Sequence, residues 1–348
     1  MIPKKGTGLS RTVCEPKHEL KRLQKKINSR IFEKVCYPSY LQGGLKDDAN
    51  PRDYVKNAAV HVRPALLVCL DIKNFYPNIR DDAVKNVFQN FLQFEPEVAE
   101  ILTLLTTVKR RIPQGGCCSS YLANLIFYDY EYKVVQRLRK LGWQYSRLLD
   151  DITLSSEDPE LDSEAAIKEI AALCRRFGLK LNNKKTAVLH REQGISELIV
   201  TGVWVAHGLP SLKKNERREI RQLVHTCEKM FAKDSASTEY HRYWNSVSGK
   251  VAKYSRMHEG LAKKYRERLQ VILPVFDEHT RGNVIKEVKT LCSKPKKEAH
   301  RIGFIKRINR AHHALGILSR TDRRLATSLR RELKAKHSSI PTLAEYWS

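Results

Sequence analysis

Residues 145–156 read YSRLLDDITLSS, and the interpretation of the whole chain depends on this stretch. Apolar and β-prone residues lead up to the adjacent carboxylates Asp150 and Asp151 and continue beyond them. This pattern predicts a β-hairpin with both aspartates at its tip. Like charges at that spacing repel each other unless water or a cation compensates them. A solvated turn is one interpretation, because aspartate is common in turns, and a metal site is the other.

A third aspartate ends another predicted strand. Residues 65–79 read ALLVCLDIKNFYPNI, an apolar run that stops at Asp71 and continues into an aromatic turn closed by Pro77. This pattern predicts a buried strand that delivers Asp71 to its end. If the strand and the hairpin are neighbours in one sheet, three carboxylates converge. Mg²⁺ takes such oxygen ligands, and a pair of these ions supports phosphoryl transfer.

The charge of the chain favours a polyanionic partner. Of 348 residues, 64 are Lys or Arg and 38 are acidic, a net charge of +26, of which residues 211–348 carry +18. Nucleic acid is the usual partner of such a surface. A generic basic protein or a binder of anionic membranes is the alternative, but no strongly amphipathic helix bearing Trp or Phe supports a membrane role.

The remaining composition indicates a cytoplasmic protein with no membrane partner. Eight cysteines occur without a CxxC spacing, which suits reduced thiols. No segment is long and apolar enough to cross a membrane, and the first residues lack the apolar stretch of a signal peptide.

The order of predicted elements is mixed, which favours an α+β core followed by a basic helical part. Before the hairpin we expect two short strands within residues 1–13, a helix within 15–35, a loop at 40–53, helices at 81–110, and a Gly-rich loop with one long helix at 111–142. After it we expect a helix at 162–177, a strand pair at 197–206, and helices from 211 onward with a break near 273–278.

A series of stretches resembles the motifs of reverse transcriptases, in the family's order along the chain. LLVCLDIKNFYPNI and RLLDDITLS are similar to the two carboxylate motifs, and IPQGGCCSSYLANL between them to the substrate-loop motif. LNNKKT and VTGVWV follow in the family's order, and IPKKGTGLSRTVCEPKHELKRLQKKI resembles the fingers hairpin. NAAVH, residues 57–61, and VTG, residues 200–202, are similar to two motifs of bacterial retron reverse transcriptases.

The resemblance covers residues 1 to about 270 and implies a right-hand polymerase fold, with fingers, a palm built on an antiparallel sheet, and a helical thumb. The implied boundaries are fingers 1–64 and 81–112, palm 65–80 and 113–210, and thumb 211–272. A basic helical extension, residues 273–348, matches no motif. It is interpreted as an RNA-binding extension, or as a docking surface for a partner protein. Its composition does not suit a ribonuclease H domain, which implies that a host ribonuclease H removes the template.

The resemblance also implies the catalytic site. Asp71, Asp150 and Asp151 would hold two Mg²⁺ ions, for which Mn²⁺ could substitute, with the Ile72 carbonyl as a further ligand. Deoxynucleoside triphosphates (dNTPs) are the implied substrates. The residues implied to bind them are Lys4, Arg11, Tyr76, Gln114 and Lys185. Lys184 is an alternative to Lys185, and Tyr76 would act as a gate against the ribose 2′-hydroxyl while Phe75 packs inward.

RNA recognition is implied for the two retron motifs and the thumb. The residues concerned are Asn57, His61, Val200, Thr201, Gly202, Lys250 and Arg256. For Asn57 and His61 the implied role is RNA recognition or template positioning. Residues 242–269 interleave Tyr, Trp, Lys and Arg, which suits tracking a backbone and stacking on bases. A solvated amphipathic helix pair has the same composition.

The implied function is RNA-directed DNA synthesis on a dedicated structured non-coding RNA. Priming from an RNA 2′-hydroxyl would give a branched RNA–DNA hybrid (msDNA), in anti-phage defence with an effector protein encoded nearby. The alternatives are another bacterial reverse transcriptase, of abortive-infection or group II intron type, and an idle RNA-binding scaffold, against which the three aspartates argue. Leu148 stands where the family usually has tyrosine.

Overall fold

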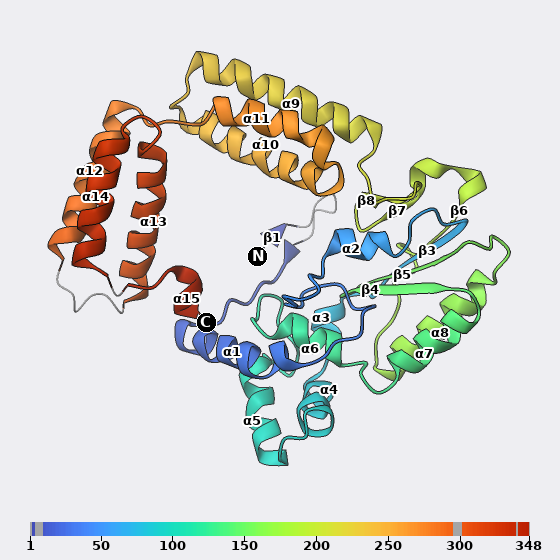
Figure 1. Ribbon diagram of the computed structural model, residues 1–348. Helices are drawn as coiled ribbons and strands as arrows, with labels where there is room; N and C mark the ends of the chain where they lie inside the picture. Colours follow the sequence, from blue (N-terminus) through green and yellow to red (C-terminus); the bar gives the residue numbers. More distant parts are fainter. Residues whose placement is uncertain (1, 4–9, 295–300, 339, 348) are drawn as a thin grey trace. The chain divides into compact units, whose positions relative to one another are not determined.

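The computed structural model describes residues 2–3, 10–294, 301–338 and 340–347. The chain divides into two compact units, Met1–Ser211 and Leu212–Ser348. The first unit combines helices with a central sheet, and the second is helical (Figure 1). The α+β class predicted from the sequence is confirmed.

The central sheet has four antiparallel strands in the order β4–β5–β3–β6. Their bounds are β3 (Leu66–Asp71), β4 (Gln144–Leu148), β5 (Asp151–Ser156) and β6 (Ala187–His190). Strand β3 lies between β5 and β6 and is almost wholly buried, which explains its continuous apolar run. The predicted hairpin is confirmed as β4–β5, and the predicted buried strand as β3.

Short elements and helices surround this sheet. The helices are α1 (His18–Arg30), α2 (Tyr54–Ala59), α3 (Phe75–Asn78), α4 (Asp81–Asn86), α5 (Pro96–Thr106), α6 (Ser119–Leu125), α7 (Glu131–Lys140) and α8 (Ser163–Arg176), with a π-helix at Val87–Phe91 and 3₁₀ turns at Phe32–Lys34, Arg191–Gln193 and Ile195–Glu197. Two small ribbons pair β1 (Ile2–Pro3) with β2 (Ser10–Arg11) and β7 (Ile199–Val200) with β8 (Val203–Trp204). Helix α7 packs against β4 and α8 (Figure 1).

The prediction of one long helix after the Gly-rich loop is wrong, because the chain turns between α6 and α7. At this turn Phe127 is fully buried, stacks on Phe75 and meets Phe177 edge-on. This packing coincides with the turn, after which α7 starts at Glu131, whose side chain is buried.

The second unit contains two groups of helices, each around its own apolar cluster. The first group is α9 (Lys214–Lys233), α10 (Thr238–Met257) and α11 (Glu259–Val271), and the second is α12 (Glu278–Ser293), α13 (Ile302–Leu318), α14 (Arg323–Lys336) and the short α15 (Leu343–Trp347). The predicted break near 273–278 is confirmed, and Asp277 caps α12 through the Thr280 N–H. None of the helices in the described part of the chain combines enough length with enough apolar residues to cross a membrane.

Candidate active site

The strand register brings the three predicted aspartates together along the backbone. Asp71, at the end of β3, is directly opposite Asp151, the first residue of β5. Asp150 lies in the tight turn between β4 and β5, where Leu149 adopts a left-handed conformation with φ 60°. The Ile72 N–H donates to the Asp150 carbonyl at 2.9 Å, which ties this turn to the end of β3.

A lysine and an asparagine hold the Asp71 carboxylate. The Lys185 ammonium lies 2.7 Å from Asp71 Oδ1, and the Asn182 side-chain amide donates to the same oxygen at 3.0 Å. This hydrogen bond to Asp71 raises the pKa of Lys185, whose side chain stays 60% exposed. Of the two lysines that the sequence left open, Lys184 and Lys185, the structure brings Lys185 to Asp71.

The donor set suits a cation, although it does not form a closed cage. Burial, and then the neighbouring Asp150 and Asp71, raise the pKa of Asp151 to about 6. This crowding of negative charge is the kind that a divalent cation relieves. Among the described residues, no three His, Cys, Asp or Glu side chains are arranged to hold a metal ion. The predicted convergence is therefore present in the strand register, and metal binding stays a prediction.

The aromatic pair after Asp71 faces in two directions. Phe75 is 2% exposed and stacks on Phe127, which confirms that it packs inward. Tyr76 is half-buried, and its hydroxyl lies 3.2 Å from Ser120 Oγ. Burial raises the pKa of Tyr76, so the phenol is neutral. Its role as a ribose gate stays a prediction, as does the metal-ligand role of the Ile72 carbonyl.

The Pro-Gln-Gly loop packs against the chain's own N-terminal segment. The Gln114 carbonyl accepts the Cys14 N–H at 2.8 Å. Gly115 has φ +105°, and a Cβ there would lie 2.7 Å from Val13 Cγ1 and 3.0 Å from the Cys14 carbonyl oxygen. In this structure the close approach that requires glycine is therefore to Val13 and Cys14.

Two further nucleotide-binding predictions concern the N-terminal ribbon. Lys4 lies outside the described residues. Arg11 belongs to β2, where its backbone pairs with Ile2. The triphosphate contacts predicted for both residues stay predictions, as does the nucleotide contact of Gln114.

The NAAVH motif forms a hydrogen-bonded chain inside the protein. Asn57 and His61 are 0% and 1% exposed. His61 Nδ1 lies 2.7 Å from Ser155 Oγ, and His61 Nε2 lies 2.7 Å from Ser146 Oγ. The Ser146 hydroxyl donates to Asn57 Oδ1 at 2.8 Å.

The donor and acceptor of each hydrogen bond in this series follow from the chemistry of the groups. Because Ser146 gives its only proton to Asn57, it accepts from His61 Nε2–H, and His61 Nδ1 accepts from the Ser155 hydroxyl. Burial lowers the pKa of His61 to about 3, which keeps the ring neutral. The RNA recognition or template positioning predicted for Asn57 and His61 stays a prediction, but both side chains are buried and present no surface to RNA in this structure. Their positions instead join α2 and its end to both strands of the catalytic hairpin.

The VTG motif packs against the same helix. It forms the turn between β7 and β8, with Thr201 and Gly202 at positive φ and Val200 fully buried. The Thr201 hydroxyl donates to the Tyr54 carbonyl at the start of α2 at 3.2 Å. Helix α2 contacts both β7 and β8. RNA binding by Val200, Thr201 and Gly202 stays a prediction: the Val200 side chain is buried, and Gly202 is exposed.

The two predicted thumb contacts are on α10. Lys250 is exposed and pairs with Glu219 at 2.6 Å. Arg256 is in the last turn of the same helix. RNA binding by either residue stays a prediction.

Sequence reasoning missed a buried ion pair next to the turn between β4 and β5 that carries Leu149 and Asp150, called the catalytic turn below. Arg147, on β4, is 0% exposed and donates to both carboxylate oxygens of Glu131 at 2.6 and 2.8 Å. Its guanidinium also donates to the Leu149 carbonyl, next to Asp150, at 3.2 Å. Burial alone would lower the pKa of Arg147, but the Glu131 carboxylate outweighs it and holds the pKa above its usual value. An arginine at an alternating strand position next to the aspartates was the available signal.

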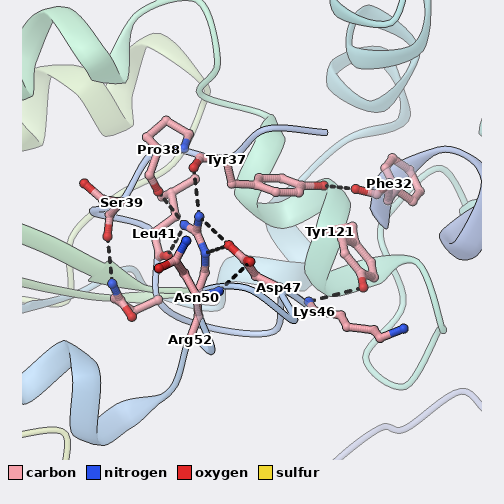
Figure 2. Close-up of polar contacts among 11 residues, drawn as sticks. Phe32, Tyr37, Pro38, Ser39, Leu41, Lys46, Asp47, Asn50, Arg52 and Tyr121 are labelled. Atoms are coloured by element: carbon pink, nitrogen blue, oxygen red, sulfur yellow. Dashed lines mark hydrogen bonds and ion pairs between the residues drawn. The ribbon is translucent and has the colours of Figure 1, made fainter. Parts of the chain in front are cut away.

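The loop at residues 40–53 is ordered by a second arginine. Arg52 uses all five guanidinium N–H groups, donating to the carbonyls of Tyr37, Pro38 and Leu41 and twice to Asp47 Oδ2 (Figure 2). The Asn50 N–H and Arg52 hold the pKa of Asp47 below its usual range.

This loop extends the edge of the central sheet beside β4. Leu41 pairs with Arg147 in a parallel bridge, in which the Arg147 N–H donates to the Tyr40 carbonyl and the Gln42 N–H to the Arg147 carbonyl. Gly43 then passes so close to the catalytic turn that a Cβ there would lie 3.0 to 3.1 Å from Leu148 and Leu149 side-chain atoms.

Carboxylates on neighbouring antiparallel strands, with a lysine beside them, are the arrangement of a polymerase palm. Comparison with known families agrees: the model of the family "Reverse transcriptase (RNA-dependent DNA polymerase)" matches residues 2–227. The chain belongs to the reverse transcriptase family and has its α+β right-hand fold. It is an RNA-directed DNA polymerase, and RNA is its template.

Curated relatives place the chain among retron enzymes. It is 44% identical to the retron Se72 reverse transcriptase of Salmonella heidelberg (strain 579083-10), over 93% of this chain and 85% of the relative. It is 32% identical to the retron Ec48 reverse transcriptase of Escherichia coli, over 77% and 67% of the two chains. With the retron Ec86 reverse transcriptase of Escherichia coli the identity is 27%, over 70% and 73%. Reverse transcriptases use divalent metal ions and dNTPs.

Proposed function

We propose that this enzyme reverse transcribes a dedicated structured non-coding RNA, primed from a 2′-hydroxyl of that RNA. The product is a branched RNA–DNA hybrid, msDNA, made in the cytoplasm for anti-phage defence. The observation that carries the proposal is the 44% identity, over 93% of the chain, with a retron reverse transcriptase. The contact between the two retron motifs supports it: NAAVH forms the end of α2, and the VTG turn packs against this helix, so the two short matches share one structural role.

The site residues take the following roles in this proposal. Asp71, Asp150 and Asp151, with the Ile72 carbonyl, hold two Mg²⁺ ions, which supply charge neutralisation and activate the attacking hydroxyl. Lys185, beside Asp71, lies near the departing pyrophosphate. Lys4, Arg11 and Gln114 bind the incoming dNTP, and Tyr76 excludes a ribonucleotide.

Each addition is a nucleotidyl transfer. A bond forms between the primer hydroxyl oxygen and the α-phosphorus, and the bond from the α-phosphorus to the bridging oxygen breaks. Pyrophosphate leaves with the bonding electrons, and the hydroxyl proton passes to solvent. A 2′-hydroxyl can serve because the chemistry needs only a hydroxyl in line with the α-phosphate.

The RNA partner is held by the basic second unit in this proposal. Residues 211–272 act as the thumb, through Lys250 and Arg256 among others, and the extension 273–348 binds structured RNA. An effector protein encoded nearby binds the complex, and host ribonuclease H trims the template. The net charge of +18 in residues 211–348 supports this assignment.

The test is to analyse nucleic acid that co-purifies with the protein when it is expressed with its native flanking DNA. Denaturing gels are run with and without ribonuclease and deoxyribonuclease. The inactive variant is Asp150→Asn/Asp151→Asn, and Glu157→Gln, an exposed acidic residue just beyond β5, is the matched control.

The proposal predicts a discrete DNA band that shifts after ribonuclease treatment, persists in Glu157→Gln and vanishes in Asp150→Asn/Asp151→Asn. RNA alone in all three samples would overturn it. DNA that does not shift after ribonuclease would overturn the branched product and leave the polymerase activity standing.

A further inference from the structure

A cavity of about 500 Å³ behind the turn that follows Asp71 has cationic walls. Its polar lining consists of Lys73, Asn74, Asn78, Arg80, Arg111 and Lys180, and no carboxylate lines it. A larger cavity of about 940 Å³ has side chains of both charge signs instead, with Glu33, Asp47 and Asp48 beside its lysines and Arg52. The smaller cavity therefore has the less compensated charge.

Backbone pairing joins this cavity to the catalytic aspartate. The segment after Asp71 runs antiparallel to residues 180–182, with Ile72 opposite Leu181. The Asn182 N–H donates to the Asp71 carbonyl, and the Lys73 N–H donates to the Lys180 carbonyl at 2.9 Å. Lys73 thus lies two residues after Asp71, Lys180 lies two residues before Asn182, and the backbones of the two cavity lysines are hydrogen-bonded to each other.

The walls of the cavity are held in place. The Asn78 side-chain amide donates to the Lys73 carbonyl at 3.0 Å, and Arg111 Nη1 donates to the Asn78 carbonyl at 3.0 Å. Arg80 and Arg111 form a backbone bridge. This leaves the remaining guanidinium N–H groups of Arg111 for a ligand, on a wall that is already ordered.

The positive charge of the cavity is only partly compensated. Arg80 pairs with Asp82 at 3.1 Å. Within the described chain, no carboxylate lies within ion-pair distance of Lys73, Lys180 or Arg111. Lysine and arginine together suit an anion with adjacent phosphates, because arginine can grip phosphate oxygens with two parallel hydrogen bonds while lysine supplies a point charge.

We propose that this cavity binds pyrophosphate as it leaves the active site. Pyrophosphate forms next to Asp71 at every nucleotide addition, and it brings several negative charges on two adjacent phosphorus atoms. A compact cavity of this volume suits it better than a nucleic-acid helix. The incoming triphosphate and the phosphates of the RNA template share this chemistry, so the test must distinguish them.

The test compares Arg111→Gln/Lys180→Gln with wild type and with Arg139→Gln/Lys140→Gln. The latter pair is exposed at the end of α7 and loses the same charge away from the cavity. Primer extension on a homopolymer RNA template with a DNA primer gives the inhibition constant of added inorganic pyrophosphate and the KM for the dNTP. Titration gives the affinity for template–primer. Circular dichroism checks folding, and Lys180→Gln alone, a change at an exposed side chain, replaces the double variant if that variant does not fold.

The proposal predicts that the pyrophosphate inhibition constant rises about tenfold or more in the cavity variant and stays at the wild-type value in the control. The KM for the dNTP should change much less. An unchanged inhibition constant would overturn the proposal. So would a parallel rise in KM, which would assign the cavity to the incoming triphosphate, or a loss confined to template affinity, which would assign it to RNA phosphates.

Discussion

Replacing His61 with phenylalanine separates a structural role of the NAAVH motif from an RNA contact. The ring keeps a similar shape, but both of its hydrogen bonds, to Ser146 and Ser155 at 2.7 Å, are lost. Ser155, which is 3% exposed, then has no acceptor for its hydroxyl proton, whereas Ser146 still donates to Asn57. The variant therefore leaves a buried donor unsatisfied.

The magnitude follows from these bonds. An unsatisfied buried group costs about 1–3 kcal/mol and a lost hydrogen bond about 1 kcal/mol, so His61→Phe should lower the free energy of unfolding by about 2–4 kcal/mol. Adding Ser155→Ala removes the orphaned hydroxyl. The double variant should therefore recover about 1 kcal/mol relative to His61→Phe.

Urea denaturation followed by circular dichroism measures these differences, and RNA titration is run in parallel. His207→Phe is the matched control, because His207 is an exposed histidine in the same unit and packs edge-on against Trp204. We expect the control to change stability by less than about 0.5 kcal/mol. RNA affinity of the folded protein should stay the same in all variants.

Two results would refute this reasoning. One is a stability of His61→Phe equal to that of the control together with weaker RNA binding, which would return the histidine to the RNA interface. The other is a further loss of stability on adding Ser155→Ala, which would show that the serine hydroxyl has another acceptor and that His61 is not its partner.

The other predictions concern the same framework. Burial lowers the pKa of His61 from 6.5 to about 3, so below pH 6.5 the folded state binds fewer protons than the unfolded state. The free energy of unfolding should therefore fall with decreasing pH, by up to about 1.4 kcal/mol per pH unit. In His61→Phe, urea denaturation at a series of pH values should show a shallower slope. Glu131→Gln leaves Arg147 buried without its carboxylate and should cost about 3–5 kcal/mol of unfolding free energy in urea denaturation; a loss below about 1 kcal/mol would contradict the buried ion pair. Arg52→Lys replaces five donors by three, so it should cost about 2 kcal/mol and slow DNA synthesis, whereas an unchanged rate of primer extension would show that the loop does not support the catalytic turn.

Local patterns were sufficient to predict the strands and their aspartates. The apolar run ending at Asp71 and the hairpin around Asp150 and Asp151 are contiguous in sequence, so periodicity and turn chemistry describe them. The prediction of one long helix failed because the contacts at the turn are between residues far apart in the sequence. At the turn where the helix is interrupted, Phe127 packs against Phe75 and Phe177, which are about 50 residues away in either direction, and no local pattern encodes that contact.

Contacts between distant residues account for what the sequence missed in the site. Arg52 bonds to carbonyl oxygens, which every residue possesses, so residue identity does not reveal its partners. His61 and Ser155 are 94 residues apart in the chain. The apolar residues inside NAAVH were no guide to this burial, because Ala58 is buried whereas Ala59 and Val60 are exposed.

The burial of Asn57, His61 and Val200 limits the direct contacts that the two retron motifs can make with RNA. Asn57 and His61 bond only to protein groups among the contacts described, and they span Ser146 on one strand and Ser155 on the next. What this arrangement sets is the geometry of the hairpin that carries Asp150 and Asp151. Any RNA contact made by these motifs is then expected from their exposed residues, which are Ala59, Val60 and, at the tip of the β7–β8 turn, Gly202. Gly202→Asn, which introduces a residue that tolerates the φ of +78° at this position, should therefore alter RNA affinity with little loss of stability, and substitutions at Asn57 the reverse. RNA titration and urea denaturation can measure this difference side by side.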